Sequence, residues 1–169
     1  LSLGCSAADD SQGNDDEVAV DDEAALSTAS NYGYFVVTRR DFRRCISPVC
    51  GGYFVKRVNA DTTRCADGSM QAECYVSSID LGGVGLSTRE QDEARAAVES
   101  GKGLIKARMY KKSFNRIPIG TLKASEAWVG ATGSAADGTF FRAANNGIVC
   151  IKAPCPTVTA YTLNDRDQQ

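Results

Sequence analysis

Beyond residue 30 the chain gathers its apolar residues into short runs or alternates them with polar ones, with a period of about two. The runs are rich in valine, isoleucine and aromatic residues, and turn residues separate them, which is typical of strands with one buried face. The strands expected on this basis are 34–37, 53–58, 75–81, 103–110, 121–129, 138–143 and 157–163. No apolar run is long enough to predict a membrane-spanning helix.

One segment departs from the strand pattern and predicts a helix over about 88–100. Ser87 and Glu90 have the spacing of a capping box, and Gly101 supplies a stop. The apolar stripe consists of Ala94, Ala97 and Val98. Because these side chains are small, we expect the helix to pack closely on a sheet. The order of strands, helix and strands predicts an α+β fold with a mostly antiparallel sheet.

The chain contains an internal repeat at a fixed offset of 105 residues, with copies at 35–59 and 140–164. Both copies follow the pattern Phe-x9-Cys-Ile-x3-Cys-x7-(Val/Leu)-Asn without gaps. Two copies are too few for a solenoid. We therefore predict a duplicated β-hairpin in which the Cys-x4-Cys segment forms the loop between two strands.

The chain has seven cysteines, an odd number that needs an explanation in an exported protein. Six of them are predicted to form three disulfides, and they are Cys45, Cys50, Cys65, Cys74, Cys150 and Cys155. Six cysteines permit fifteen pairings, and the short gaps favour local ones. The gaps of four and eight residues differ from the two-residue gaps typical of structural zinc sites, so no metal is expected.

The seventh cysteine, Cys5, ends a segment typical of the end of a bacterial lipoprotein signal peptide. Gly4 fits this lipobox, while Ser2 and Leu3 are swapped relative to its usual order, and an ordinary signal-peptide remnant is the alternative for residues 1–5. Lipidation of Cys5 would leave six cysteines for three bridges. The segment 6–30 has eight acids, no base and no aromatic residue, which predicts a disordered acidic tether.

The remaining residues, 31–169, are expected to form a single disulfide-rich domain. It is basic, with nineteen Lys and Arg against thirteen Asp and Glu. Four arginines, with Lys56 and Arg57, cluster beside the first cysteine loop, and the four are Arg39, Arg40, Arg43 and Arg44. They could bind an anionic partner such as lipid headgroups, envelope polysaccharide or the acidic tether. The pattern favours the alternative, a solvated hairpin edge whose positive charge discourages aggregation.

Several segments resemble a domain-of-unknown-function family found in predicted exported proteins and lipoproteins, chiefly of myxobacteria. The resemblance covers about residues 32–164. The segments that carry it are Tyr34–Val37, Cys45–Asn59, Cys65–Gly68, Glu126–Trp128 and Gly147–Pro156. The resemblance implies an exported, disulfide-bonded domain, and it brings no established activity, substrate, cofactor or catalytic residue.

The chain has no histidine, which excludes Ser-His-Asp and Cys-His catalysis. No catalytic residue and no cofactor is therefore expected, and the protein is not expected to be an enzyme. One alternative is a hydrolase that uses Glu126 and Asp80 as a carboxylate pair. Trp128 could stack on a sugar, although a lone tryptophan in an apolar strand more often belongs to the core.

The two cysteine loops, 45–50 and 150–155, offer a further alternative. A short loop closed by a disulfide loses little entropy on binding, and protease inhibitors present such loops. Lys152 would suit a trypsin-like pocket. The pattern favours bridges that simply stabilise a modest core.

Together these features predict a bacterial cell-envelope lipoprotein, anchored to the outer membrane through Cys5 and acting as a non-enzymatic binding or structural module. Its expected partner is an unknown envelope protein or polysaccharide. Nucleic acid is not expected outside the cell.

Overall fold

The computed structural model describes residues 32–135, 137–152 and 154–165. Its elements, in chain order, are β1 (Gly33–Arg40), β2 (Tyr53–Arg57), β3 (Thr63–Arg64), β4 (Met70–Gln71), β5 (Cys74–Asp80), the 3-10 helix η1 (Gly82–Val84), α1 (Thr88–Glu99), β6 (Gly103–Phe114), β7 (Ile117–Val129), β8 (Phe141–Asn145) and β9 (Val158–Thr162).

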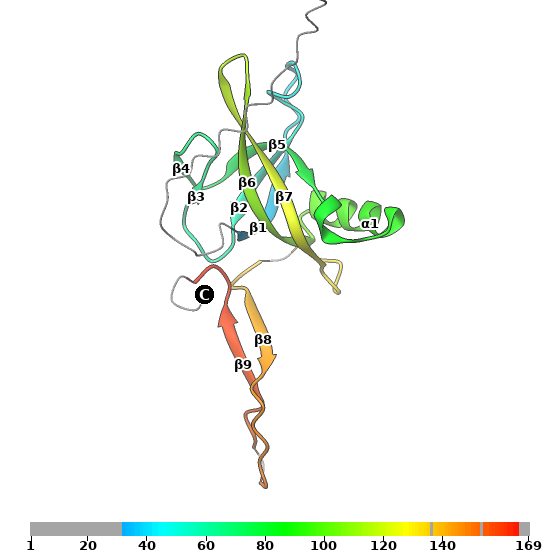
Figure 1. Cartoon of the computed structure of the whole chain (residues 1–169), viewed down its shortest axis with the longest axis vertical. Coiled ribbons are helices and arrows are strands. Elements are labelled where there is room, and N and C mark those ends of the chain that lie inside the picture. Colours follow the sequence, from blue (N-terminus) through cyan, green and yellow to red (C-terminus); the bar gives the residue numbers. More distant parts are fainter. Residues whose placement is uncertain (1–31, 136, 153, 166–169) are drawn as a thin grey trace, which may run out of the picture.

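Five strands close into a barrel in the order β1, β2, β5, β7 and β6 (Figure 1). Neighbouring strands are antiparallel, except that β5 and β7 are parallel. A parallel pair needs a long connection, and here η1, α1 and β6 lie between the two strands in the chain. The structure confirms an α+β fold with mostly antiparallel strands, one helix and disulfides. Closure of the sheet is an addition that the apolar pattern did not predict.

The barrel interior holds the main apolar core. Alternate strand positions point inward, and the side chains of Val55, Val76, Ile105 and Leu122 are fully buried there. Burial of each such side chain stabilises the fold by about 1.5–3 kcal/mol relative to exposure. The barrel therefore contains most of the buried apolar surface that stabilises the fold.

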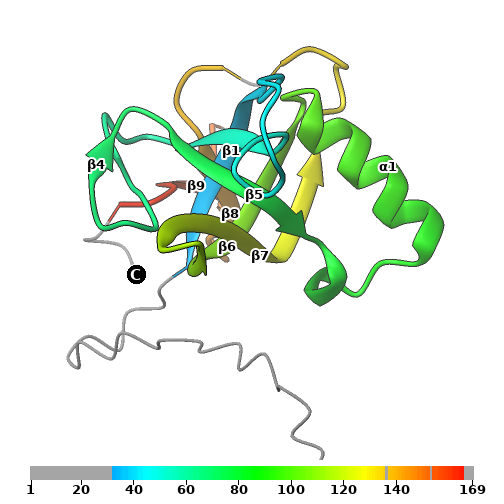
Figure 2. The ribbon, with the colours of Figure 1, turned by 90° about the horizontal axis from the view of Figure 1, so that it is seen from above.

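Helix α1 lies against one side of the barrel, as Figure 2 shows. It starts with the predicted capping box, in which the Ser87 N–H donates to Glu90 Oε2 at 2.9 Å, and Gly101 ends it with a φ of +72°. Gly103 on β6 lets the helix approach, since a Cβ there would lie 2.7 Å from Val98 Cγ2. The predicted helix is confirmed. No helix in the described part of the chain is long and apolar enough to cross a membrane.

Strands β6 and β7 form a longer hairpin than the strands expected at 103–110 and 121–129. They meet at a two-residue turn, Asn115–Arg116, with φ of +49° and +66°. Positive φ at both central residues defines a type I′ turn, which sequences usually signal with Asn-Gly or Asp-Gly. The expected boundaries were wrong because Asn-Arg does not carry that signal.

The predicted duplication of a hairpin is confirmed. Strands β1 and β2 form the first copy, and β8 and β9 form the second as a separate two-stranded ribbon that projects from the barrel (Figure 1). Arg40 pairs with Tyr53 in the first copy, and Asn145 pairs with Val158 in the second, at the same offset of 105 residues. The strand expected at 138–143 lies at 141–145 instead.

Six cysteines form three bridges, each between neighbours in the sequence. The pairs are Cys45–Cys50, Cys65–Cys74 and Cys150–Cys155, with Cα–Cα distances of 5.6, 5.3 and 5.6 Å. These are the local pairs that the short gaps favour. Two of the bridges close the loops of the duplicated hairpins, and the third ties the β3–β4 turn to β5.

Candidate functional site

The tip of the β8–β9 ribbon is a loop closed by Cys150–Cys155. Among the described residues, Ile151 and Val149 are the most exposed large apolar side chains, with Val149 at 93% and Ile151 fully exposed. Lys152 is also exposed. The structure thus places the predicted loop, and Lys152 within it, at the far end of a projecting ribbon.

The base of the ribbon is fixed to the first hairpin by two asparagines, each of which forms hydrogen bonds with the backbone of the other hairpin copy. Asn59 Nδ2 donates to the carbonyl oxygens of Phe140 and Leu163, at 2.7 and 2.9 Å, and the Phe140 N–H donates to Asn59 Oδ1 at 2.8 Å. Asn164 binds the other copy in the same way. Its Nδ2 donates to Tyr34 O and Val58 O, at 3.0 and 2.7 Å, and the Tyr34 N–H donates to Asn164 Oδ1 at 2.9 Å.

A second, smaller apolar core lies between the two copies. Val36, Val58 and Leu163 are buried in it, and Tyr34 and Phe140 pack against them. Val58 and Leu163 are equivalent positions of the repeat, each directly before its asparagine. The paired asparagines and this core explain how a ribbon with little buried surface of its own is held in a defined orientation.

At the first cysteine loop, three of the four predicted arginines contact neighbours within the protein. Arg39 lies over the Phe54 ring at 3.5 Å and its Nε donates to Glu73 at 2.9 Å. Arg40 lies 6.0 Å from the Tyr53 ring centre. These contacts place the long side chains on aromatic surface, where cation–π attraction contributes about 0.5–1 kcal/mol at exposed sites.

Arg43 pairs with Asp41, whose side chain is only 2% exposed. Two guanidinium nitrogens donate to the carboxylate at 2.9 Å, and the Arg43 backbone N–H donates to it at 3.1 Å. The hydrogen bonds from Arg43 hold the pKa of Asp41 below its ordinary value of 3.8. Arg44 is exposed to solvent, as are the other three arginines. The predicted cluster therefore makes contacts within the protein through Arg39, Arg40 and Arg43 while its side chains stay exposed to solvent.

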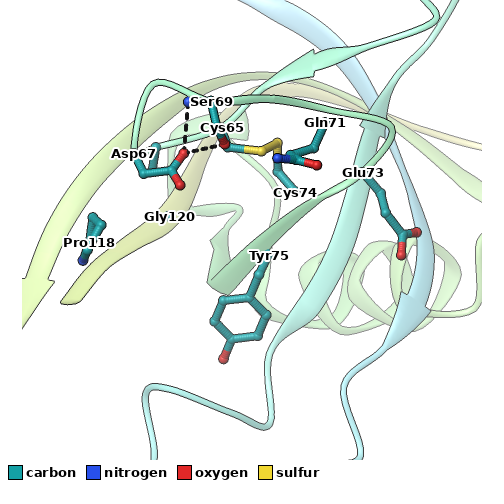
Figure 3. Close-up of a pocket in the computed structure, with 10 residues that line it drawn as sticks. Cys65, Asp67, Ser69, Gln71, Glu73, Cys74, Tyr75, Pro118 and Gly120 are labelled. Atoms are coloured by element: carbon teal, nitrogen blue, oxygen red, sulfur yellow. Dashed lines mark hydrogen bonds between the residues drawn. A yellow bond between two sulfur atoms is a disulfide. The ribbon is translucent and has the colours of Figure 1, made fainter.

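A hollow of about 210 Å³ lies beside the Cys65–Cys74 bridge and is lined by the β3–β4 segment and by the first residues of β5 and β7 (Figure 3). Its volume is below the 300–1,000 Å³ typical of ligand pockets. Asp67 in its wall accepts hydrogen bonds from the Ser69 hydroxyl and N–H, at 2.7 and 3.0 Å, and these lower the pKa of Asp67. Burial opposes ionisation of Glu73, but hydrogen bonds from Thr38 and Arg39 outweigh it and lower that pKa as well. The two carboxyl groups are therefore held ionised, which suits anchors of a turn better than proton donors.

The two carboxylates suggested for hydrolysis lie on different strands and have separate partners. Glu126 on β7 accepts a hydrogen bond from Lys106 Nζ at 2.8 Å. Asp80 at the end of β5 accepts one from the Gly82 N–H at 2.8 Å. Asp80 lines a hollow of about 120 Å³ that does not include Glu126. The structure does not bring the pair together around a cavity.

Trp128 is not a core residue, so that expectation was wrong. It is 41% exposed at the end of β7, and its ring lies 5.7 Å from that of Tyr34. The alternation along β7 explains the difference, because Ala127 packs toward the barrel core and Trp128 points outward.

Two predictions lie outside the described residues, namely lipidation of Cys5 and the tether 6–30. Within the described residues, no group of three or more His, Cys, Asp or Glu side chains is placed to hold a metal ion. Sequence reasoning found the repeat but missed the role of Asn59 and Asn164. The available signal was the asparagine at the end of both copies. A polar side chain that recurs at the same position of a structural repeat is expected to have a structural role.

Comparison with known proteins yields a family but no characterised relative. No curated protein and no solved structure matches the chain. The family model described as "Domain of unknown function (DUF6748)" matches residues 34–169, which takes in the barrel, both cysteine loops and the projecting ribbon. The chain therefore belongs to the DUF6748 family.

Proposed function

We propose that this protein is a non-enzymatic binding module of the bacterial cell envelope, tethered through a lipid on Cys5, and that it binds a protein partner with the Cys150–Cys155 tip. The observation that carries the proposal is the exposure of Val149 and Ile151 at the end of a projecting ribbon. Exposed apolar side chains that gather at one place mark interaction sites more often than isolated ones do.

The shape of the tip favours a macromolecular partner over a small ligand. A ribbon end is convex, so it enters a groove on another protein, whereas small molecules are held in concave pockets. The bridge also limits the conformations of the free loop, which reduces the entropy that binding would cost. The hollow beside Cys65 and Cys74 is small, and its carboxylates already accept internal hydrogen bonds.

The proposal is tested by capture from a detergent extract of the cell envelope with the immobilised full chain. The variant Val149→Ser/Ile151→Ser should lose the captured protein. The matched control, Met70→Ser/Val129→Ser, removes two apolar side chains that are each 57% exposed elsewhere, and it should retain that protein. Equal capture by wild type and the tip variant would contradict a role for the tip.

A second candidate function, protease inhibition, is favoured by the exposed Lys152 beside the fully exposed Ile151 in a bridged loop. Inhibition of a trypsin-like serine protease should be lost in Lys152→Ala and retained in Lys56→Ala, which removes an exposed lysine from β2. Absence of inhibition by the wild-type protein would dismiss this candidate and leave the binding proposal standing.

The tether is tested by the intact mass of the protein purified from its native membrane. A diacylglycerol on Cys5 adds several hundred daltons, and three disulfides remove about six. An unmodified Cys5 would contradict the lipid anchor without bearing on the ribbon tip.

A further inference from the structure

The hairpin formed by β6 and β7 extends beyond the barrel at the end opposite to the β8–β9 ribbon (Figure 1). Strand β1 pairs with β6 only as far as Ala107, and β5 pairs with β7 only from Gly120. We call the part beyond these pairings, residues 108–119, the arm. Its backbone is paired only with itself. Near the turn its side chains are mostly exposed, whereas Met109 packs against the barrel core and Ile119 is buried.

The arm is strongly basic. From residue 100 to residue 125 the chain has seven cations and no acid, and the cations are Lys102, Lys106, Arg108, Lys111, Lys112, Arg116 and Lys123. Lys111, Lys112 and Arg116 near the turn are exposed. Asp67 lies near Lys111, and Asp80 lines a hollow with Lys112 and Lys123. Lys106 is paired with Glu126, and the six other cations outnumber Asp67 and Asp80, so the arm keeps a positive charge.

Apolar side chains lie among these cations. Phe114 pairs with Ile117 across the hairpin, and Lys112 pairs with Ile119 on the same face, because cross-strand partners share a face. Of these, Ile119 is buried, so the exposed apolar surface lies at the turn. Ile117 is 46% exposed at the turn. Further down this face, Arg108 and Lys123 both lie over the Tyr110 ring, at 5.3 and 5.0 Å.

The first cysteine loop, 41–52, lies at the same end of the molecule as the arm (Figure 1). It contributes two further exposed apolar side chains, Phe42 at 83% and Ile46 at 70%. Arg43 and Arg44 lie between them in the sequence. This end therefore combines exposed apolar side chains with cations contributed by two separate segments.

The backbone at Arg116 supports a role for its charge. Its φ of +66° lies in the left-handed region that glycine adopts most easily and that strains a long side chain. Residues kept in such conformations gather at functional sites. An arginine where the turn favours glycine places a cation at the outermost point of the arm.

We propose that this end of the protein docks on the surface of a bilayer that contains anionic lipids. Lys111, Lys112 and Arg116 bind the headgroup phosphates, while Ile117, with Phe42 and Ile46 from the loop, enters the boundary between headgroups and acyl chains. The positive charge of this end complements the negative charge of anionic lipids. The apolar side chains at its convex surface can enter a bilayer, which deforms around them. Membrane docking by this end goes beyond the proposed function and does not depend on which protein the ribbon tip binds.

The test uses the full chain with Cys5→Ser, so that no lipid anchor contributes, and measures co-sedimentation with vesicles. Vesicles of phosphatidylcholine with about one third phosphatidylglycerol should bind the protein, and vesicles of phosphatidylcholine alone should not. Rising salt should weaken the binding, because salt screens exposed charges. Lys111→Ala/Lys112→Ala/Arg116→Ala should lose about a hundredfold in affinity, since each cation near an anionic surface contributes roughly fivefold.

The matched control removes three cations elsewhere, in Lys56→Ala/Arg142→Ala/Lys152→Ala, and should bind within about twofold of the wild type. An equal loss in this control would overturn the proposal, because binding would then follow total charge. Vesicle binding that appears only after deletion of residues 6–30 would also overturn the proposal. The acidic tether would then be the partner that covers the basic arm.

Two single variants test the geometry without risk to the fold. Arg116→Gly suits the turn and should weaken vesicle binding about fivefold. Ile117→Trp should show a blue-shifted fluorescence on anionic vesicles and quenching by brominated lipids. A tryptophan at 117 that stays in water while the protein is bound would overturn insertion of the arm.

Discussion

At the level of single residues, the charges that look most available in the sequence are partly occupied within the protein. Arg39 and Arg43 donate to Glu73 and Asp41, and Arg40 lies near the Tyr53 ring. Asp41 is the buried member of this set, and an unpaired carboxylate there would be costly. The ion pair therefore fixes the path of the chain as it leaves β1 and enters the cysteine loop.

The Asp41–Arg43 pair predicts a pH dependence of stability. The pKa of Asp41 is lowered in the folded protein, so its ionised form stabilises the fold above the ordinary pKa of 3.8 and this stabilisation is lost as the pH falls through the lowered value. The urea midpoint of Asp41→Asn should therefore lie below that of the wild type at neutral pH, and the gap should narrow below about pH 4. Asp61→Asn, at an exposed turn, serves as control. A gap that is constant down to the lowest pH would contradict this assignment.

Asn59 and Asn164 predict a local rather than a global loss of stability. Glycine at either position tolerates the positive φ, of 53° and 63°, but removes three hydrogen bonds between the two hairpin copies. At about 1 kcal/mol for each bond, deuterium exchange in β8 and β9 should become at least tenfold faster in Asn59→Gly or Asn164→Gly. The barrel strands should keep their protection. Asn115→Gly, also at positive φ, is the control, and equal effects from all three variants would contradict the docking role.

At the level of elements, the three bridges have different surroundings and therefore different expected effects on stability. Cys74 is 1% exposed and belongs to the barrel core, whereas Cys150 lies at the exposed tip. A bridge stabilises mainly by restricting the unfolded chain. At the tip, however, loss of the bridge raises the conformational entropy of the loop in the folded protein as well as in the unfolded chain. The two increases in entropy largely cancel in the free energy of unfolding.

Replacement of the bridges by serine pairs tests this difference. Cys65→Ser/Cys74→Ser should lower the free energy of unfolding by about 2–4 kcal/mol. Cys150→Ser/Cys155→Ser should lower it by less than about 1 kcal/mol while it weakens partner binding. Chemical denaturation measures both variants. The expectation fails if the tip variant proves as unstable as the core variant.

At the level of the whole molecule, the barrel separates two projecting elements. The β6–β7 arm and the first cysteine loop lie at one end, and the β8–β9 ribbon lies at the other (Figure 1). A protein that docks on a membrane with the first end would hold the ribbon tip away from that membrane. Membrane docking by the arm and partner binding by the ribbon tip are therefore compatible with one orientation of the protein on the membrane.

That orientation predicts which lysines a membrane shields. With the Cys5→Ser protein on anionic vesicles, acetylation of Lys111 and Lys112 should slow severalfold, because headgroups cover the arm. Lys152 at the ribbon tip should react as it does in free protein. Mass spectrometry of tryptic peptides reads out both sites, and equal protection of Lys152 would exclude the end-on orientation.

The helix and the duplicated hairpin could be predicted from the sequence because each depends on local interactions. The helix follows from the capping box at Ser87 and Glu90 and from the glycine at 101. The duplicated hairpin follows from the repeated spacing around its cysteines. Such features depend on residues within a few positions of one another, and their physical requirements are met by the chain segment itself.

Only the tertiary structure decided the features that depend on distant residues. The parallel pairing of β5 with β7 closes the barrel. The hydrogen bonds from Asn59 to Leu163 and from Asn164 to Val58 join segments about a hundred positions apart. Packing chooses among many registers and pairings that a local pattern permits equally. The sequence by itself therefore determined the helix, the repeat and the approximate places of the main strands, while long-range packing decided where the strands end, how the barrel closes and which end each loop occupies.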